Sequence, residues 1–97
     1  MSGVKNRVAL VTGAGSANGI GYATANLLRA AGAKVAITST TERIFQRLEE
    51  MDGTVEDTYA KTADLTDTKS VKSLIENVEG ALGAIDIVIN NAGMVQT

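Results

Sequence analysis

Three short motifs in this chain combine residue types that bind ligands through backbone amides and short polar side chains. They occupy residues 12–21 (Thr-Gly-Ala-Gly-Ser-Ala-Asn-Gly-Ile-Gly), 64–67 (Asp-Leu-Thr-Asp) and 90–93 (Asn-Asn-Ala-Gly). Glycine leaves backbone N–H groups open to a ligand, while aspartate and asparagine supply hydrogen-bond acceptors and donors. Because each motif follows a strand-like run, we expect all three to lie at the ends of strands.

The glycine-rich motif predicts an anion-binding turn between a strand and a helix. Glycine permits positive φ and lacks the Cβ that would keep a phosphate away from the backbone. A helix beginning near Ile20 would add free N–H groups and the positive end of its dipole. Gly13, Gly15 and Gly19 miss the dinucleotide fingerprint G-x-G-x-x-G by one residue, so an ordinary strand-to-helix turn is the alternative interpretation.

Runs of strand length alternate with segments of helical periodicity. The expected strands cover residues 7–11, 34–38, 58–63 and 85–89. The expected helices run from Ile20 to Gly32, from a capping box at Ser39 and Glu42 to residues 52–53, and from Val71 to Gly83. The third strand is poorly apolar, which is typical of the edge of a sheet.

This alternation predicts an α/β protein with one parallel sheet and right-handed crossovers. The expected strand order is 3-2-1-4, which reverses between the first and fourth strands. In doubly wound sheets, ligands bind beyond the carboxyl ends of the strands at such a reversal. The first and third motifs should therefore meet at the edge of a crevice, with the first two helices on one face of the sheet and the third on the other.

Composition excludes several other functions. The 97 residues include no cysteine or histidine, so disulfides, a thiolate nucleophile and a first-row metal site are not expected. A net charge of −2 and 3% aromatic residues argue against nucleic-acid binding. No segment has the length and apolar character of a membrane span, and residues 1–6 meet strand sequence too soon for a signal peptide. We therefore expect a cytoplasmic protein.

Taken together, the three motifs resemble the short-chain dehydrogenase/reductase family, most closely its 3-oxoacyl-acyl-carrier-protein reductases. The resemblance extends over essentially the whole chain. It implies a Rossmann-type doubly wound parallel sheet, with residues 1–97 forming the N-terminal β-α-β-α-β-α-β portion of a single dinucleotide-binding domain. The glycine motif departs from the family pattern, because five residues separate Gly13 from Gly19 where the family usually has three.

The resemblance implies a cofactor role for the first two motifs. The glycine-rich turn would hold the pyrophosphate through Gly13, Gly15, Ser16, Asn18, Gly19 and Ile20. Asp64 would accept a hydrogen bond from the adenine amino group, and the N–H of Leu65 would donate to a ring nitrogen. The alternative for Asp64 is a cap or turn residue before the third helix.

The third motif would contact the sugar of the cofactor. The resemblance implies that Asn91 meets the ribose while Asn90 braces the sheet. Ala92 and Gly93 are small, so the backbone there can lie close to the cofactor. The alternative interpretation is a simple asparagine-rich turn.

The residues after the second strand favour NADP over NAD. An acidic side chain there would accept hydrogen bonds from an unmodified ribose and repel a 2′-phosphate. This chain instead has Ser39, Thr40 and Arg43, which offer hydroxyls, helix-start N–H groups and a guanidinium to a phosphate. Two observations favour NAD: a Ser39 used as a helix cap is not free for the cofactor, and Glu42 lies close by.

The family's catalytic serine, tyrosine and lysine match no residue of this chain. Tyr22 and Tyr59 have Asn26 and Ala63 four residues later, where the family has lysine, so we expect both tyrosines to pack in the core. The resemblance implies that the complete enzyme is a dimer or tetramer that reduces a carbonyl, such as a 3-oxoacyl thioester, to an alcohol. Residues 1–97 alone should be inactive.

Two other functions stay open from the sequence. A nucleotide-binding or regulatory module without catalysis would show the same motifs, and a serine followed by Tyr-x-x-x-Lys beyond residue 97 would distinguish an enzyme from it. A sugar-nucleotide epimerase is disfavoured, because residues 90–93 resemble the shorter reductases.

Overall fold

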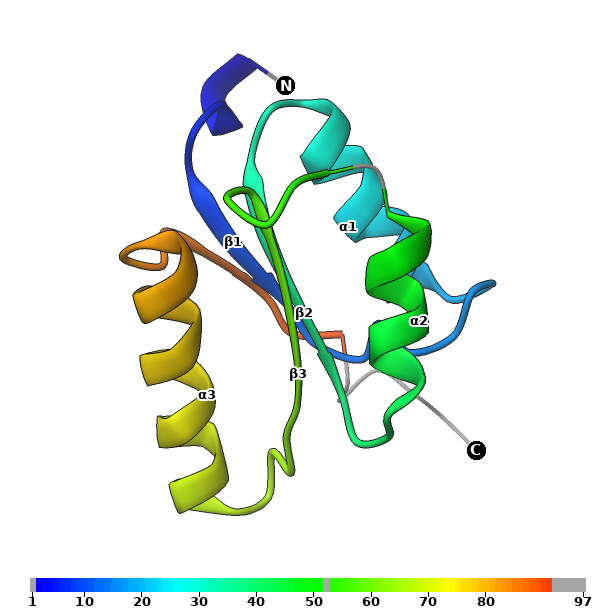
Figure 1. The fold of residues 1–97 in the computed structure, drawn as a ribbon, viewed down its shortest axis with the longest axis vertical. Helices are drawn as coiled ribbons and strands as arrows, with labels where there is room; N and C mark the ends of the chain where they lie inside the picture. Colours follow the sequence, from blue (N-terminus) through cyan, green and yellow to red (C-terminus); the bar gives the residue numbers. More distant parts are fainter. Residues whose placement is uncertain (1, 52, 92–97) are drawn as a thin grey trace.

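A sheet of four parallel strands runs through the computed structural model, which describes residues 2–51 and 53–91 (Figure 1). The strands are β1 (Val8–Val11), β2 (Lys34–Ser39), β3 (Thr58–Thr62) and β4 (Ile87–Ile89). The helices are α1 (Ile20–Ala30), α2 (Arg43–Glu50) and α3 (Thr68–Leu82), and a short 3-10 helix, η1 (Ser2–Val4), precedes β1. This order confirms the alternation that the periodicity predicted.

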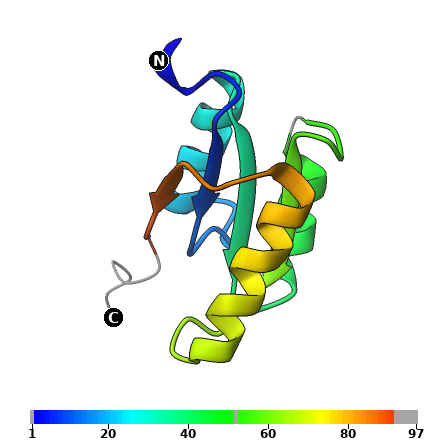
Figure 2. The ribbon, with the colours of Figure 1, turned by 90° about the vertical axis from the view of Figure 1, so that its left-hand side faces the viewer.

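The strand order is β3-β2-β1-β4, and every neighbouring pair is parallel. Val11 of β1 pairs with Ile37 of β2 on one side and with Ile89 of β4 on the other. Figure 2 shows β4 at one edge of the sheet beside β1. The predicted order is therefore confirmed, and the ends of β1 and β4 lie side by side at the carboxyl edge of the sheet.

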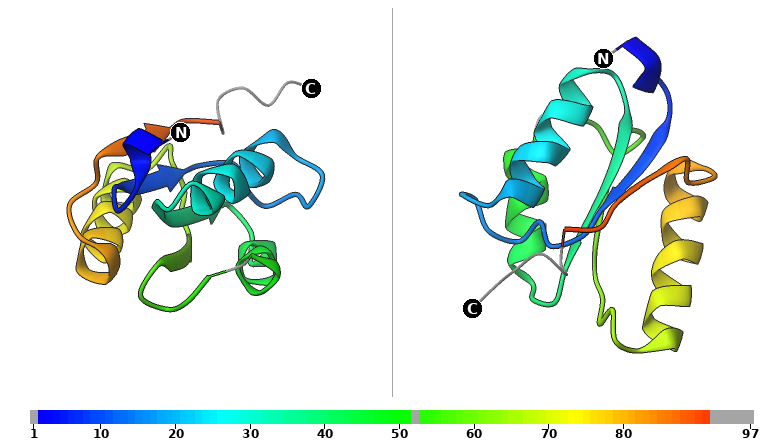
Figure 3. Two further views of the ribbon diagram at one scale, coloured as in Figure 1. Left: turned by 90° about the horizontal axis from the view of Figure 1, so that it is seen from above. Right: turned by 180° about the vertical axis from the view of Figure 1, so that it is seen from behind.

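Helices cover both faces of the sheet, with α1 and α2 on one face and α3 on the other (Figures 1 and 3). Neighbouring residues of β1 point to opposite faces, so Val11 joins the core under α1 and α2 while Leu10 joins the core under α3. Tyr22 is buried in the first core and Tyr59 packs against the second. Both tyrosines are packing residues, as predicted.

The start of α2 differs from the prediction, because the capping box of Ser39 and Glu42 does not form. Ser39 is the last residue of β2, and Glu42 occupies the N-cap position without a side-chain hydrogen bond. The Ser39 hydroxyl donates to the Thr41 carbonyl at 2.8 Å and accepts from the Thr41 N–H at 3.3 Å. A serine hydroxyl reaches backbone groups two residues away easily, and here that local turn replaces the cap.

The helix α3 begins at Thr68, before Val71, which is the first residue of the predicted apolar stripe. Asp67 is its N-cap residue and accepts a hydrogen bond from the Lys69 N–H at 3.0 Å. The first turn is polar, so apolar periodicity did not reveal it. Asp67, and not Asp64, is thus the cap of this helix.

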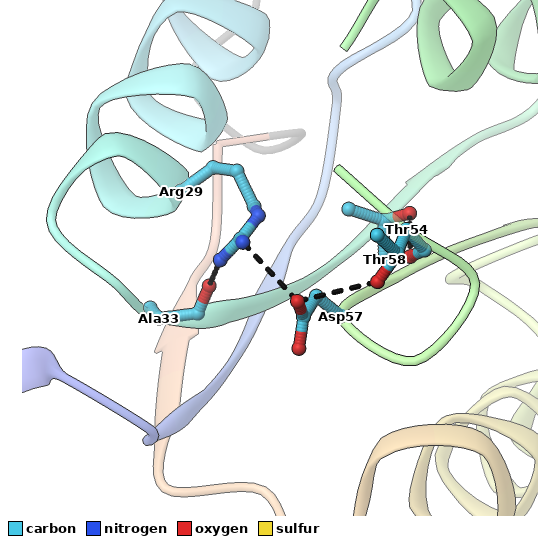
Figure 4. Close-up of polar contacts among 5 residues, drawn as sticks. All are labelled: Arg29, Ala33, Thr54, Asp57 and Thr58. Atoms are coloured by element: carbon cyan, nitrogen blue, oxygen red, sulfur yellow. Dashed lines mark hydrogen bonds and ion pairs between the residues drawn. The ribbon is translucent and has the colours of Figure 1, made fainter. Parts of the chain in front are cut away.

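Polar groups pair with one another at the end of the sheet where β2 and β3 begin (Figure 4). Arg29 of α1 donates to the Ala33 carbonyl at 2.5 Å and to the Asp57 carboxylate at 3.2 Å. The Thr54 hydroxyl donates to the same carboxylate oxygen at 3.2 Å. This network, called the Arg29 network below, ties α1 to the turn before β3.

Candidate cofactor-binding site

A cavity of about 400 Å³ opens at the carboxyl edge of the sheet, beside the ends of β1, β2 and β3. It is lined by Gly13, Gly15, Ser16, Thr38, Ser39, Thr40, Arg43, Ala63 and Leu65. The β1–α1 loop, the β2–α2 turn and the β3–α3 loop meet here because parallel strands end at the same edge. Many of the predicted site residues therefore surround one cavity, although they are far apart in the sequence.

The β1–α1 loop offers backbone groups, and few side chains, to this cavity. Gly13 has a φ of 67°, a conformation that glycine adopts readily and other residues rarely do. The Ala14 N–H donates to the Thr38 carbonyl at 3.1 Å, which holds the loop against the end of β2. Gly19 is the N-cap of α1 and has no side chain to cap it. The N–H groups of the first helical turn thus have no side-chain cap and, as at the start of any α-helix, no partner within the helix.

The longer glycine loop forms a small turn that projects from the side of the molecule (Figure 1). The Gly19 N–H donates to the Ser16 carbonyl at 3.1 Å, and the Asn18 N–H lies 3.4 Å from the Ser16 hydroxyl. Ser16 lines the cavity, whereas Asn18, Gly19 and Ile20 do not. The roles that the resemblance implies for those three residues stay predictions.

Gly21 holds this loop in place, a role that the sequence analysis did not assign to it. A Cβ at Gly21 would lie 2.6 Å from the Gly13 carbonyl oxygen and 2.8 Å from Nδ2 of Asn91. Only glycine therefore lets α1 approach the loop this closely. The available signal was Gly21 itself, the last glycine of the motif at residues 12–21.

The asparagine motif ties β4 to the glycine loop. The buried Asn91 side chain donates from Nδ2 to the Gly13 carbonyl at 3.1 Å, and its backbone N–H donates to the Thr12 hydroxyl at 2.9 Å. The Thr12 hydroxyl also donates to Oδ1 of the exposed Asn90 at 3.1 Å. Both asparagines brace the ends of β1 and β4, so bracing is not limited to Asn90 as the resemblance implied.

Two expectations for the third motif go beyond these contacts. A ribose contact by Asn91 stays a prediction. The expected close approach at Ala92 and Gly93 concerns residues that lie outside the described part of the chain.

The β2–α2 turn supplies the positive side of the cavity. Arg43 is exposed, and its Nε donates to the Thr41 hydroxyl at 3.3 Å. Ser39 and Thr40 line the cavity with it, and no acidic side chain does so among the described residues. A guanidinium with neighbouring hydroxyls suits a phosphate group.

Asp64 is exposed at an opening next to the cavity, which Thr40 and Ala63 also line. Its Oδ1 accepts hydrogen bonds from the Thr66 hydroxyl at 2.6 Å and the Thr66 N–H at 2.9 Å. The Thr66 hydroxyl, followed by the Thr66 N–H, lowers the pKa of the Asp64 carboxyl below its ordinary value of 3.8. Asp64 therefore carries a negative charge at neutral pH and stabilises the local turn, and Leu65 lines the cavity beside it.

Comparisons with known proteins agree with this architecture. Residues 13–97 match the protein family described as enoyl-(acyl carrier protein) reductase. The chain is 43% identical over 88 residues to 1-deoxy-11-beta-hydroxypentalenate dehydrogenase of Streptomyces avermitilis, covering 90% of this chain and 32% of that protein. It is 38% identical over 90 residues to the 3-oxoacyl-[acyl-carrier-protein] reductase FabG of Escherichia coli, covering 93% of this chain and 35% of the relative.

A solved structure shows the same fold. The crystal structure of a short chain dehydrogenase from Mycobacterium smegmatis superposes with a TM-score of 0.82 at 31% sequence identity, over 91% of this chain and 37% of that one. The parallel sheet and its helices thus define an α/β protein of Rossmann-like architecture. The chain belongs to the short-chain dehydrogenase/reductase family of oxidoreductases.

The chain spans about a third of the length of the curated relatives it matches. Within residues 2–51 and 53–91, no helix has the length and apolar character needed to cross a membrane.

Proposed function

We propose that this chain is the NADP-binding portion of a short-chain oxidoreductase, the N-terminal part of a single dinucleotide-binding domain. The observation that carries the proposal is the wall of the cavity beside β2, where Ser39, Thr40 and Arg43 stand and no described acidic side chain takes part. A carboxylate there would repel a 2′-phosphate, whereas a guanidinium attracts it. Ser39 does not cap α2, but its hydroxyl is bonded to Thr41 instead, so the guanidinium of Arg43 carries more of this argument than the Ser39 hydroxyl does.

Other residues at the carboxyl edge fit the adenine and pyrophosphate groups of the cofactor. The N–H groups at the start of α1 suit the pyrophosphate, because no side chain caps them and they lie at the positive end of the helix dipole. Asp64 is ionised and uses Oδ1 for Thr66, so Oδ2 is left to accept from the adenine amino group. The bound cofactor supplies the hydride, and these residues fix its position.

The proposal extends to the complete enzyme. The relative named 3-oxoacyl-[acyl-carrier-protein] reductase supports reduction of a carbonyl to an alcohol, with a 3-oxoacyl thioester as the substrate class to test first. Our proposal places the family's catalytic serine, tyrosine and lysine outside residues 1–97, so we expect residues 1–97 alone to be inactive. We further propose a cytoplasmic enzyme that works as a dimer or tetramer.

Titration of the complete protein with NADPH and NADH tests the choice of cofactor. We expect NADPH to bind about tenfold more tightly or better, since one charge-assisted contact to a phosphate accounts for that ratio. Arg43→Ala should reduce the NADPH affinity and leave the NADH affinity nearly unchanged. Tighter binding of NADH by the unmodified protein would refute the NADP assignment.

Turnover tests the enzymatic part of the proposal separately. Oxidation of NADPH in the presence of a 3-oxoacyl thioester, followed by absorbance at the nicotinamide band, should occur with the complete protein. Tight cofactor binding without turnover of any carbonyl substrate would favour the non-catalytic module instead.

A further inference from the structure

Gly15 lies where the glycine loop touches the β2–α2 turn. It is buried, and a Cβ at this position would lie 3.0 Å from both Cβ and Oγ of Ser39. The same Cβ would lie 3.5 Å from Nη2 of Arg43. Gly15 does not have the positive φ found at Gly13, so its backbone suits alanine and only space distinguishes the two residues.

A chain of hydrogen bonds connects this contact to the Arg43 guanidinium. The Ser39 hydroxyl bonds to both the carbonyl and the N–H of Thr41. The Thr41 hydroxyl in turn accepts from Nε of Arg43 at 3.3 Å. A displacement of Ser39 would therefore be passed through Thr41 to Arg43. The start of α1 takes no part in these hydrogen bonds.

We propose that Gly15 is a positioning residue for cofactor choice: the absence of a side chain at Gly15 keeps Ser39 and Arg43 where they can bind the 2′-phosphate. The inference rests on the proposed function, because it concerns the same cavity. It adds that the preference for NADP depends on a residue of the glycine loop as well as on the β2–α2 turn. A Cβ at 3.0 Å is closer than side chains normally pack, so Ser39 must move in a Gly15→Ala variant.

The test compares the dissociation constants of NADPH and NADH for the complete protein and its Gly15→Ala variant. We expect the NADPH constant to rise by about tenfold, which corresponds to the loss of one charge-assisted hydrogen bond. The NADH constant should rise by a clearly smaller factor, because NADH has no 2′-phosphate and any crowding of the shared pyrophosphate by the new Cβ affects both cofactors equally. Gly80→Ala is the matched control, since a Cβ at Gly80 meets no atom within 4 Å. The ratio of the NADPH and NADH dissociation constants of this variant should equal that of the unmodified protein.

A second variant distinguishes a push on Ser39 from a general distortion of the loop. Ser39→Gly removes the two atoms that the new Cβ would crowd at 3.0 Å and leaves Nη2 of Arg43 at the ordinary contact distance of 3.5 Å. In that background, Gly15→Ala should leave the ratio of the two constants unchanged, because nothing remains to be displaced. The inference would be overturned if Gly15→Ala weakened the binding of both cofactors equally. It would also be overturned if Gly15→Ala reduced the preference for NADPH by the same factor with serine and with glycine at position 39.

A different result would contradict the proposed function. If the unmodified protein binds NADH more tightly, the NADP assignment is wrong, and the inference falls with it. If the unmodified protein prefers NADPH and the ratio is the same in Gly15→Ala, only the inference is wrong. Circular dichroism of each variant establishes that it is folded.

Discussion

The two ends of the sheet use polar residues in opposite ways. Where β2 and β3 begin, the Arg29 network joins a guanidinium, a carboxylate, a hydroxyl and a backbone carbonyl to one another (Figure 4). Where the strands end, the guanidinium of Arg43 and the carboxylate of Asp64 face openings at the carboxyl edge. At the first end the charged groups pair with each other, whereas at the second end Arg43 and Asp64 are exposed and form no ion pair with each other.

The difference separates charged side chains that stabilise the fold from charged side chains that are available to the cofactor we propose. Arg29 and Asp57 are only partly exposed, with 20% and 33% of their side-chain surface accessible, so their ion pair is shielded from water. At the carboxyl edge, close packing comes from backbone instead, through Gly15 and Gly21. Changes to charged side chains at the two ends should therefore separate in their effects on stability and on cofactor affinity, whereas a change at the closely packed Gly21 should affect both.

The largest effect should follow Gly21→Ala. This variant tests whether close packing at the carboxyl edge supports both the stability of the fold and the affinity for the cofactor. The new Cβ would lie 2.6 Å from the Gly13 carbonyl oxygen and 2.8 Å from Nδ2 of Asn91. We expect the free energy of unfolding to fall by about 1–3 kcal/mol, together with weaker binding of both cofactors. Urea unfolding of the complete protein measures the first, and titration with NADPH and NADH the second.

Gly80→Ala again provides the control for Gly21→Ala. Gly80 lies inside α3 with open space around its Cα, so alanine should leave stability unchanged or raise it by up to about 1 kcal/mol. If Gly21→Ala were as stable as this control, Gly21 would not hold the loop.

The next effect should follow Arg29→Ala at the opposite end. The change removes the bond to the Ala33 carbonyl and leaves Asp57 without its guanidinium partner. We expect the free energy of unfolding to fall by about 1–3 kcal/mol, while the dissociation constants of NADPH and NADH stay within about twofold. A variant that binds the cofactors much more weakly while it unfolds like the unmodified protein would contradict this division of roles.

The smallest effect on stability should follow Asp64→Ala, because this carboxylate is exposed. Its effect on binding should be larger: if Asp64 accepts from adenine, both cofactors weaken by about tenfold, since adenine is common to them. Isothermal titration calorimetry at neutral pH measures this. An unchanged affinity for both cofactors would show that the adenine assignment is wrong.

The pH dependence of stability gives an independent check on Asp64. Its pKa in the folded protein lies below the ordinary value of 3.8, so the folded state binds this proton more weakly than the unfolded chain. The carboxylate therefore stabilises the fold above pH 3.8, and this contribution is lost as the pH falls through the lowered pKa. The stability difference between the unmodified protein and Asp64→Asn should accordingly be constant at neutral pH and shrink in acid.

Much of the architecture could be predicted from sequence because it depends on local periodicity. Apolar runs such as residues 7–11 and the stripe of α1 predicted the elements, and their alternation predicted parallel strands in the order 3-2-1-4. The capping box at Ser39 and Glu42 failed because two short-range partners competed for one hydroxyl, and the Thr41 turn prevailed. The sequence motif for a cap does not include that competition.

The site was predicted as a set of loops, and its internal contacts were not. Gly13, Ser39 and Leu65 line one cavity, as expected of loops that follow neighbouring parallel strands. That Asn91 donates to the Gly13 carbonyl, or that Gly15 abuts Ser39, depends on distances between loops far apart in the chain. No spacing within a motif reports such distances.

The sequence by itself determined which backbone segments meet at the carboxyl edge, because the period of apolar residues dictates strands and helices and parallel order dictates where loops converge. Only the tertiary structure decided which polar groups are exposed at an opening and which are paired within the fold. Asp64 and Asp57 are both carboxylates close to β3, yet one is exposed beside an opening and the other is paired with Arg29. The physical reason is that a polar side chain takes the partner that folding brings within about 3 Å, whatever its distance along the chain.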